Sequence, residues 1–142
     1  MKREVFIVFA LLIAFGLQAQ SPEKMSYQAI IRNGSGNLVA NTVIGMRISI
    51  LQTTAAGAAV YVETQTPTTT ASGLVSLEIG TGTVVSGTFA GINWGADVYF
   101  LKTETDLAGG TNYTIAGTSQ LLSVPYALNA KTAQTVTGLA NG

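Results

Sequence analysis

Residues 43–52 read Val-Ile-Gly-Met-Arg-Ile-Ser-Ile-Leu-Gln, and this stretch decides the fold class. Its large apolar side chains recur at every second position, at Ile44, Met46, Ile48 and Ile50. Successive side chains of a strand point to opposite faces, so this period of two predicts a long strand with one buried face. The residues between them are mostly small or polar, which is typical of a face that meets water.

The same alternation continues along most of the chain. Further strands are expected over residues 26–32, 60–66, 75–79, 98–106, 113–116 and 118–124. Turn sequences rich in Gly and Asn separate them, as at residues 33–37, where the chain should reverse. Pro67 should end the strand before it, because proline cannot donate to a central ladder. About seven strands at this spacing predict an all-β fold, an antiparallel sandwich of two sheets.

The start of the chain has the layout of a secretory signal peptide. Lys2 and Arg3 precede an apolar run over residues 5–17, and Ala19 offers a small residue for cleavage. The alternative, a retained membrane anchor, needs roughly 20 apolar residues, which is longer than this run. We therefore expect a secreted or cell-surface protein, with no stable membrane insertion after the leader is removed.

The expected organisation has four parts: a signal peptide over residues 1–19, an N-terminal arm over 20–25, a β-sandwich domain over 26–124 and a short Ala-rich C-terminal segment over 125–142. In the last part, Ala127, Ala130 and Ala133 recur every three residues, which predicts a short helix with small residues along one side. Isolated helices shorter than about 12–15 residues are marginal in water. We therefore expect these alanines to contact a partner protein or a second copy of the chain.

Charge and composition limit the classes of partner. Seven basic and seven acidic residues leave no formal net charge, so no field exists to recruit nucleic acid or an anionic membrane. Charged residues are 10% of the chain, against roughly 25% in a typical domain. Near-neutral surfaces associate readily, which favours contact with protein.

The chain has neither His nor Cys, so it lacks the groups of most catalytic triads, imidazole bases and zinc sites. A glycosidase would need two convergent carboxylates. The candidates are Glu63, Glu78, Glu104 and Asp106. Alternation places each on an outward face or at a strand end, where a solvated charge is the simpler interpretation. We expect no catalytic residue, no enzyme activity and no cofactor.

Oxygen ligands for calcium could come from Asp97, Asp106 and Asn112. Their spacing matches no calcium-loop motif. The sequence therefore predicts no metal site.

Residues 83–95 are less regular than the rest of the domain. Phe89, Ile92 and Trp94 are spaced like one short helical turn laid over the open end of a core. Trp94 has two interpretations, a buried core residue or a platform on which a sugar stacks, and the core role is the more frequent for a lone Trp. A ligand-binding module would draw on exposed aromatic residues. The candidates are Trp94, Tyr99, Tyr113 and Tyr126.

Three stretches, at residues 26–38, 73–80 and 117–128, together resemble the N-terminal module of secreted cell-surface proteins of Bacteroidota. The β-sandwich of that module often precedes fibre-like or repetitive regions. The first stretch is also similar to the transthyretin-like, or immunoglobulin-like, fold of carboxypeptidase regulatory domains. The resemblance implies an extracellular or surface-attached module without catalytic residues.

Two functional hypotheses follow. The first is a structural or assembly module that mediates protein–protein contact, as the N-terminal part of a fibre or adhesin-like protein. The second is an extracellular module that binds a glycan or another ligand.

Overall fold

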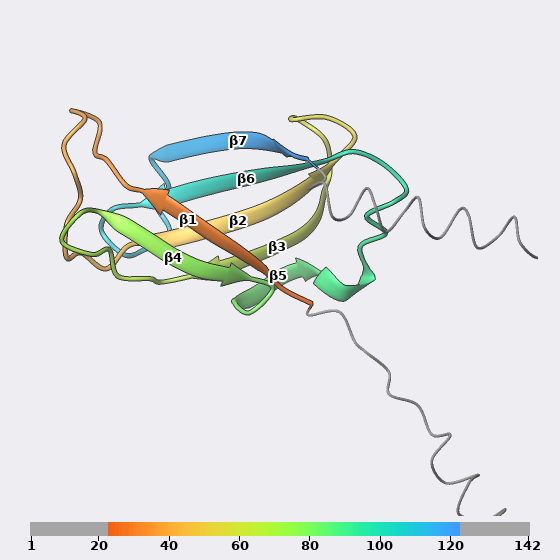
Figure 1. Ribbon diagram of the computed structural model, residues 1–142, viewed down its shortest axis with the longest axis horizontal. Coiled ribbons are helices and arrows are strands. Elements are labelled where there is room, and N and C mark those ends of the chain that lie inside the picture. Colours follow the sequence, from red (N-terminus) through yellow and green to blue (C-terminus); the bar gives the residue numbers. More distant parts are fainter. Residues whose placement is uncertain (1–22, 123–142) are drawn as a thin grey trace, which may run out of the picture.

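The computed structural model describes residues 23–122, which form seven strands in two antiparallel sheets (Figure 1). The elements are β1 (Met25–Ile30), β2 (Gly45–Gln52), β3 (Ala59–Gln65), β4 (Leu74–Ile79), β5 (Thr83–Gly87), the 3-10 turn η1 (Phe89–Gly91), β6 (Tyr99–Asp106) and β7 (Ile115–Leu121). β1 and β4 form the small sheet, and the large sheet has the order β5-β3-β2-β6-β7. The expected all-β class and the pairing of antiparallel strands in two sheets are confirmed.

Several expectations lie outside the described residues. They are the leader over residues 1–19, the first half of the N-terminal arm, and the C-terminal segment with Tyr126, Ala127, Ala130 and Ala133. Within residues 23–122, no helix is long and apolar enough to cross a bilayer.

β2 is the central strand of the large sheet, as its apolar alternation predicts. It pairs with β3 on one side and with β6 on the other. Met46, Ile48 and Ile50 point inward and are at most 1% exposed. Burial of side chains of this size stabilises the fold by about 1.5–3 kcal/mol each.

The small sheet lies across the inner face of the large one, and the two enclose a single core (Figure 1). Val75, Leu77 and Ile79 of β4 are buried against that face. The inward residues of β1 are only half-buried, and Gly117 and Ser119 on the inner face of β7 are exposed. The second layer therefore covers the middle of the large sheet and stops short of β7.

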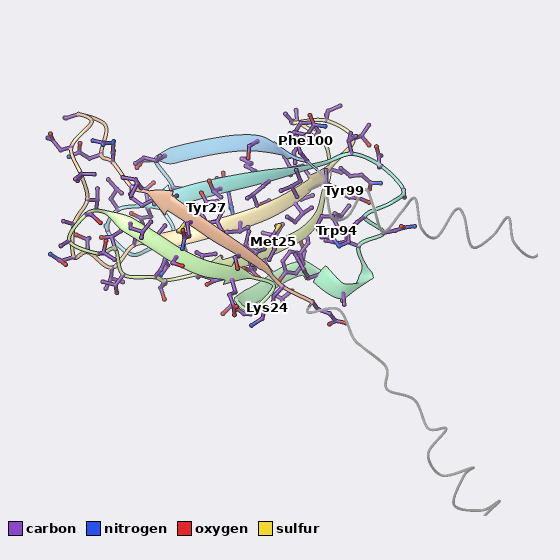
Figure 2. The ribbon with its side chains drawn as sticks, in the orientation of Figure 1. Lys24, Met25, Tyr27, Trp94, Tyr99 and Phe100 are labelled. Carbon is purple, nitrogen blue, oxygen red and sulfur yellow. The ribbon has the colours of Figure 1, made fainter. Side chains whose placement is uncertain are left out.

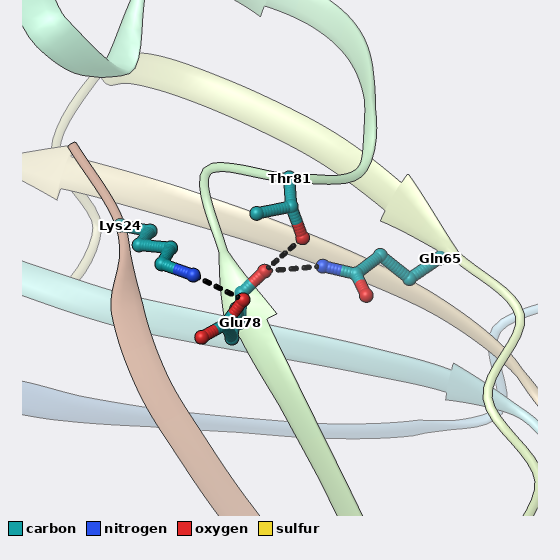
Figure 3. A network of polar contacts seen from close by, with 4 residues as sticks. All are labelled: Lys24, Gln65, Glu78 and Thr81. Atoms are coloured by element: carbon teal, nitrogen blue, oxygen red, sulfur yellow. Dashed lines mark hydrogen bonds and ion pairs between the residues drawn. The ribbon is translucent and has the colours of Figure 1, made fainter. Parts of the chain in front are cut away.

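A polar link joins the two sheets at the end of β4 (Figure 3). The Gln65 amide of β3 donates to the carbonyl oxygen of Glu78 at 2.9 Å, and the Thr81 hydroxyl donates to the same oxygen at 2.8 Å. The Glu78 carboxylate pairs with Lys24 at 2.8 Å. That ion pair is exposed and contributes about 1 kcal/mol or less, so the carbonyl link is the firmer connection.

The turn over residues 33–37 reverses the chain as predicted. The Asn33 side-chain oxygen accepts from the backbone amides of Ser35 and Asn37, each at 3.0 Å. Arg32 and Leu38 then form an isolated antiparallel bridge. The turn is thus stabilised by its own asparagine.

Two strands differ from the sequence-based expectation. β5 occupies residues that carry no alternation, and the strands expected over 113–116 and 118–124 are one continuous strand, β7. All five residues of β5 are exposed, so neither of its faces was constrained to be apolar. The expected helical turn is present in part, because η1 spans only Phe89–Gly91 while Phe89 and Ile92 pack against the core.

Candidate functional site

Trp94 lies between η1 and β6 and is 44% exposed, rather than buried in the core. Its ring meets the rings of Phe89 and Tyr99 edge to face, at centroid distances of 5.6 and 5.2 Å. Figure 2 shows Trp94 and Tyr99 next to each other. Phe89 meets Tyr61 in the same way at 5.3 Å. The four rings therefore form a chain that begins and ends at buried tyrosines, Tyr61 and Tyr99, and Trp94 is its most exposed member. Tyr99 is thus not the exposed aromatic residue that the sequence predicted.

An open hollow of about 350 Å³ lies beside this chain of rings. It is lined by Gln52, Val60, Thr88, Gly91, Ile92, Asn93, Ala96 and Tyr99. The Tyr99 hydroxyl donates to the carbonyl oxygen of Asn93 at 2.9 Å, which fixes the loop that forms one wall. Apolar walls with a few amide and hydroxyl groups suit a small polar ligand.

The other two aromatic candidates do not join this site. Tyr113 lies under the guanidinium of Arg47, 4.7 Å from the ring centroid. Arg47 is opposite Glu104 in the β2–β6 pair, and both lie on the outer face of the large sheet, whereas Tyr99 lies on the inner face. Tyr126 is outside the described residues. The structure thus brings Trp94 and Tyr99 together and places Tyr113 on another surface.

The four carboxylates considered for catalysis lie in different parts of the fold, and none lines the hollow. Glu78 is on the exposed face of the small sheet, and Asp106 ends β6. Glu104 lies on the outer face of the large sheet, where it pairs with Arg47 at 2.7 Å and Lys102 at 3.2 Å. The hydrogen bond from Arg47 lowers the pKa of Glu104.

The expectation that each carboxylate lies on an outward face or at a strand end is wrong for Glu63. It is 0% exposed and lies on the inner face of β3, opposite Ile48 of β2. A buried carboxylate is costly unless its oxygens are hydrogen-bonded. The neighbouring groups meet this requirement.

Both oxygens of Glu63 accept hydrogen bonds. Oε2 accepts from the Tyr61 hydroxyl at 2.6 Å and from the backbone amides of Gly80 at 2.9 Å and Gly82 at 3.2 Å. Oε1 accepts from the Gln65 amide at 2.7 Å. Burial, together with the bond to Glu63, raises the pKa of Tyr61. Glu63 therefore anchors the turn between β4 and β5.

The three residues considered for calcium are not gathered in one place. Asp97 precedes β6 and Asp106 ends it, a separation of roughly 30 Å along an extended strand. Asp106 accepts from the backbone amides of Ala108 and Asn112 at 2.9 Å each, and these bonds lower its pKa. No cluster of three or more acidic, His or Cys side chains suited to a metal occurs in residues 23–122.

The free edges of the large sheet form a second kind of site. β5 ends the sheet on one side and β7 on the other. β5 has five residues and an irregular register with β3, and Gly87 at its end has a φ of +77°. β7 has seven residues, pairs with β6 in unbroken register and contains no charged residue or proline. Natural edge strands are protected by charge, proline, bulges or short length. β7 has none of these protections.

No sequence motif marks β7 as a site. The sequence feature that could have indicated this site is an absence, because residues 115–121 include no charged residue and no proline. Such a run becomes informative only when the strand is known to be at an edge.

The comparisons with known proteins concern the same region. The model of a family described as a domain of unknown function, DUF8740, matches residues 26–120. No curated protein and no solved structure matches the chain. The family match begins within β1 and ends within β7, so it includes the core, the hollow and both sheet edges. The chain belongs to the DUF8740 family.

Proposed function

We propose that this chain is a secreted or cell-surface structural module that acts through contact with other protein chains, without enzyme activity. The observation that carries the proposal is the edge of β7. Five of its seven residues are exposed, and no strand lies beyond it in the described part of the chain.

Such an edge can bind protein through its main chain. A partner strand that aligns with a free edge gains backbone hydrogen bonds, whereas its side chains need only avoid clashes. Thr118, Ser119 and Gln120 on β7 are small or flexible polar residues and carry no charge that would repel a partner. The low charge of the whole chain favours the same mode of contact.

The proposal includes finer features. We place the two layers in a transthyretin-like or immunoglobulin-like sandwich, and we propose a leader over residues 1–19 and a position at the N-terminal part of a fibre or adhesin-like protein. The layout of the first nineteen residues supports the leader, and the resemblance supports the other two features.

Photo-crosslinking tests protein contact at β7. Because the chain has no Cys of its own, a cysteine-reactive photo-crosslinker labels only an introduced cysteine. With Ser119→Cys on β7, we expect covalent protein adducts on cells that secrete the chain. The matched control is Ser76→Cys, an exposed serine on β4, which should give several-fold less adduct. Equal or absent adducts at the two positions would contradict contact through β7.

A second candidate function, glycan or small-ligand binding, is favoured by the hollow beside Trp94. Gln52 and Asn93 supply polar side chains to its walls, and Trp94 exposes part of an aromatic ring nearby. Sugars bind to such combinations of aromatic and amide groups.

Replacing Trp94 by alanine separates the two functions. We expect a loss of about 1–2 kcal/mol of unfolding free energy, because two edge-to-face ring contacts disappear. Adducts at Ser119→Cys should be unchanged. If the wild-type chain binds on a glycan array and both Trp94→Ala and the more conservative Trp94→Phe lose that binding while remaining folded, the second function is the correct one.

A further inference from the structure

We infer that β7 pairs with β7 of a second copy, so that two large sheets join into one continuous sheet across a twofold axis. This inference rests on the proposed function, and it identifies the protein partner as a second copy of the chain. Figure 1 shows β7 as the last strand on its side of the sheet, with its outer edge uncovered by any other described element.

The sequence of β7 is complementary to itself in an antiparallel register centred on Thr118. In that register Thr118 faces Thr118 of the second copy, and Ile115 faces the partner's Leu121. Gly117 then faces the partner's Ser119, and Ala116 faces the partner's Gln120. Cross-strand Thr–Thr and apolar pairs are favourable, and no like charges meet.

The same register preserves the two faces of the sheet. Ile115 and Leu121 are opposite Thr105 and Tyr99 of β6, so both belong to the inner face. Residues directly opposite in an antiparallel pair share a face, and this register therefore pairs inner residues with inner residues. Leu121 is half-buried at the rim of the core and gains an apolar neighbour from the second copy.

Pairing of β7 with β5 of another copy, which would build an open fibre, fits less well. β5 is two residues shorter than β7, and its register with β3 shifts between Val62 and Glu63. An irregular edge twists away from an incoming strand. Of the two edges of the large sheet, only β7 is regular, so association through this sheet should close as a dimer.

Complementary charges at Thr118 test the pairing, because this residue meets its own copy only in the proposed register. Thr118 is exposed, so the fold should tolerate substitution. Lys102 of β6 lies opposite it, so Thr118→Lys also adds a like-charge pair within the chain and Thr118→Glu an opposite-charge pair. We expect Thr118→Lys and Thr118→Glu each to weaken dimerisation of the full chain, expressed without the leader, by roughly tenfold because like charges then oppose each other. A mixture of the two variants should recover a heterodimer. Sedimentation equilibrium measures all three dissociation constants.

Thr83→Lys and Thr83→Glu on β5 are the matched controls, since Thr83 is also an exposed threonine on an edge strand. Dimerisation should be unchanged in both. A wild-type chain that stays monomeric at all concentrations would overturn the inference. So would a dimer that is weakened at Thr83 and not at Thr118, or variants at Thr118 that weaken the dimer without recovery on mixing. Adducts with a different protein at Ser119→Cys, without a dimer, would overturn the second copy as partner and leave the proposed function standing.

Discussion

Replacing Glu63 by alanine should lower the free energy of unfolding by about 3–5 kcal/mol, one of the two largest effects that we expect from a single substitution in this chain. The carboxylate accepts hydrogen bonds from Tyr61, Gln65, Gly80 and Gly82. Removing it leaves buried donors without an acceptor, and each such group costs about 1–3 kcal/mol. Denaturation by urea, monitored by Trp94 fluorescence, measures the change.

Two control variants distinguish the effect of losing the hydrogen bonds to Glu63 from the effect of losing a negative charge. Glu78→Ala removes an exposed carboxylate of the neighbouring strand and should cost about 1 kcal/mol or less. Glu63→Gln keeps one oxygen acceptor and should have an intermediate effect. Hydrogen exchange at the amides of Gly80 and Gly82 should accelerate in both Glu63 variants and not in Glu78→Ala. Equal effects of Glu63→Ala and Glu78→Ala would show that the buried network contributes nothing.

Alternation along a strand does not by itself determine which of the two faces points into the core, as Glu63 of β3 shows. Along β3, Val60, Val62 and Thr64 alternate with Tyr61, Glu63 and Gln65. By hydrophobicity the face with the valines is the expected inner one. The structure places the other face inward, because Glu63 supplies an acceptor to the turn at Gly80 and Gly82. These hydrogen bonds join residues that are 17 and 19 positions apart in the sequence. The alternation within β3 therefore gives no indication of them.

The central strands could be predicted because both neighbours and the opposite layer constrain them. β2, β3 and β6 were expected within two residues of their observed bounds. The edge strands β5 and β7 were missed or divided, since an exposed strand needs no period of apolar residues. The same lack of constraint leaves β7 free for a partner, so the weakest part of the sequence-based prediction coincides with the candidate contact site.

The hollow beside Trp94 was not predictable for a different reason. Gln52, Val60 and Tyr99 come from three strands, and they meet only after the strands are placed in register. The short turn at Phe89 and Ile92 was predictable from spacing, and it does cover an open end of the core. The depth of the space that it encloses depends on the loop held by Tyr99 and Asn93.

Gly87→Ala should destabilise the fold by about 2–5 kcal/mol, through two separable causes. Gly87 has a φ of +77°, which costs an L-residue about 1–2 kcal/mol. A Cβ atom there would also clash with the carbonyl oxygen of Val60, so β5 would have to move away from β3. Overpacking of this kind costs roughly a further 1–3 kcal/mol. Urea denaturation of the variant measures the sum.

Two other glycines separate the causes. Gly36 has a φ of +82°, and a methyl group added there would have nothing within 4 Å, so Gly36→Ala should show the backbone cost alone, about 1–2 kcal/mol. Gly34 has open space and no positive φ, so Gly34→Ala should change stability by about 0.5 kcal/mol or less. If Gly87→Ala costs no more than Gly36→Ala, β5 can shift without loss. Its irregular pairing with β3 would then contribute little to the fold, and the large sheet would be held by β3, β2, β6 and β7.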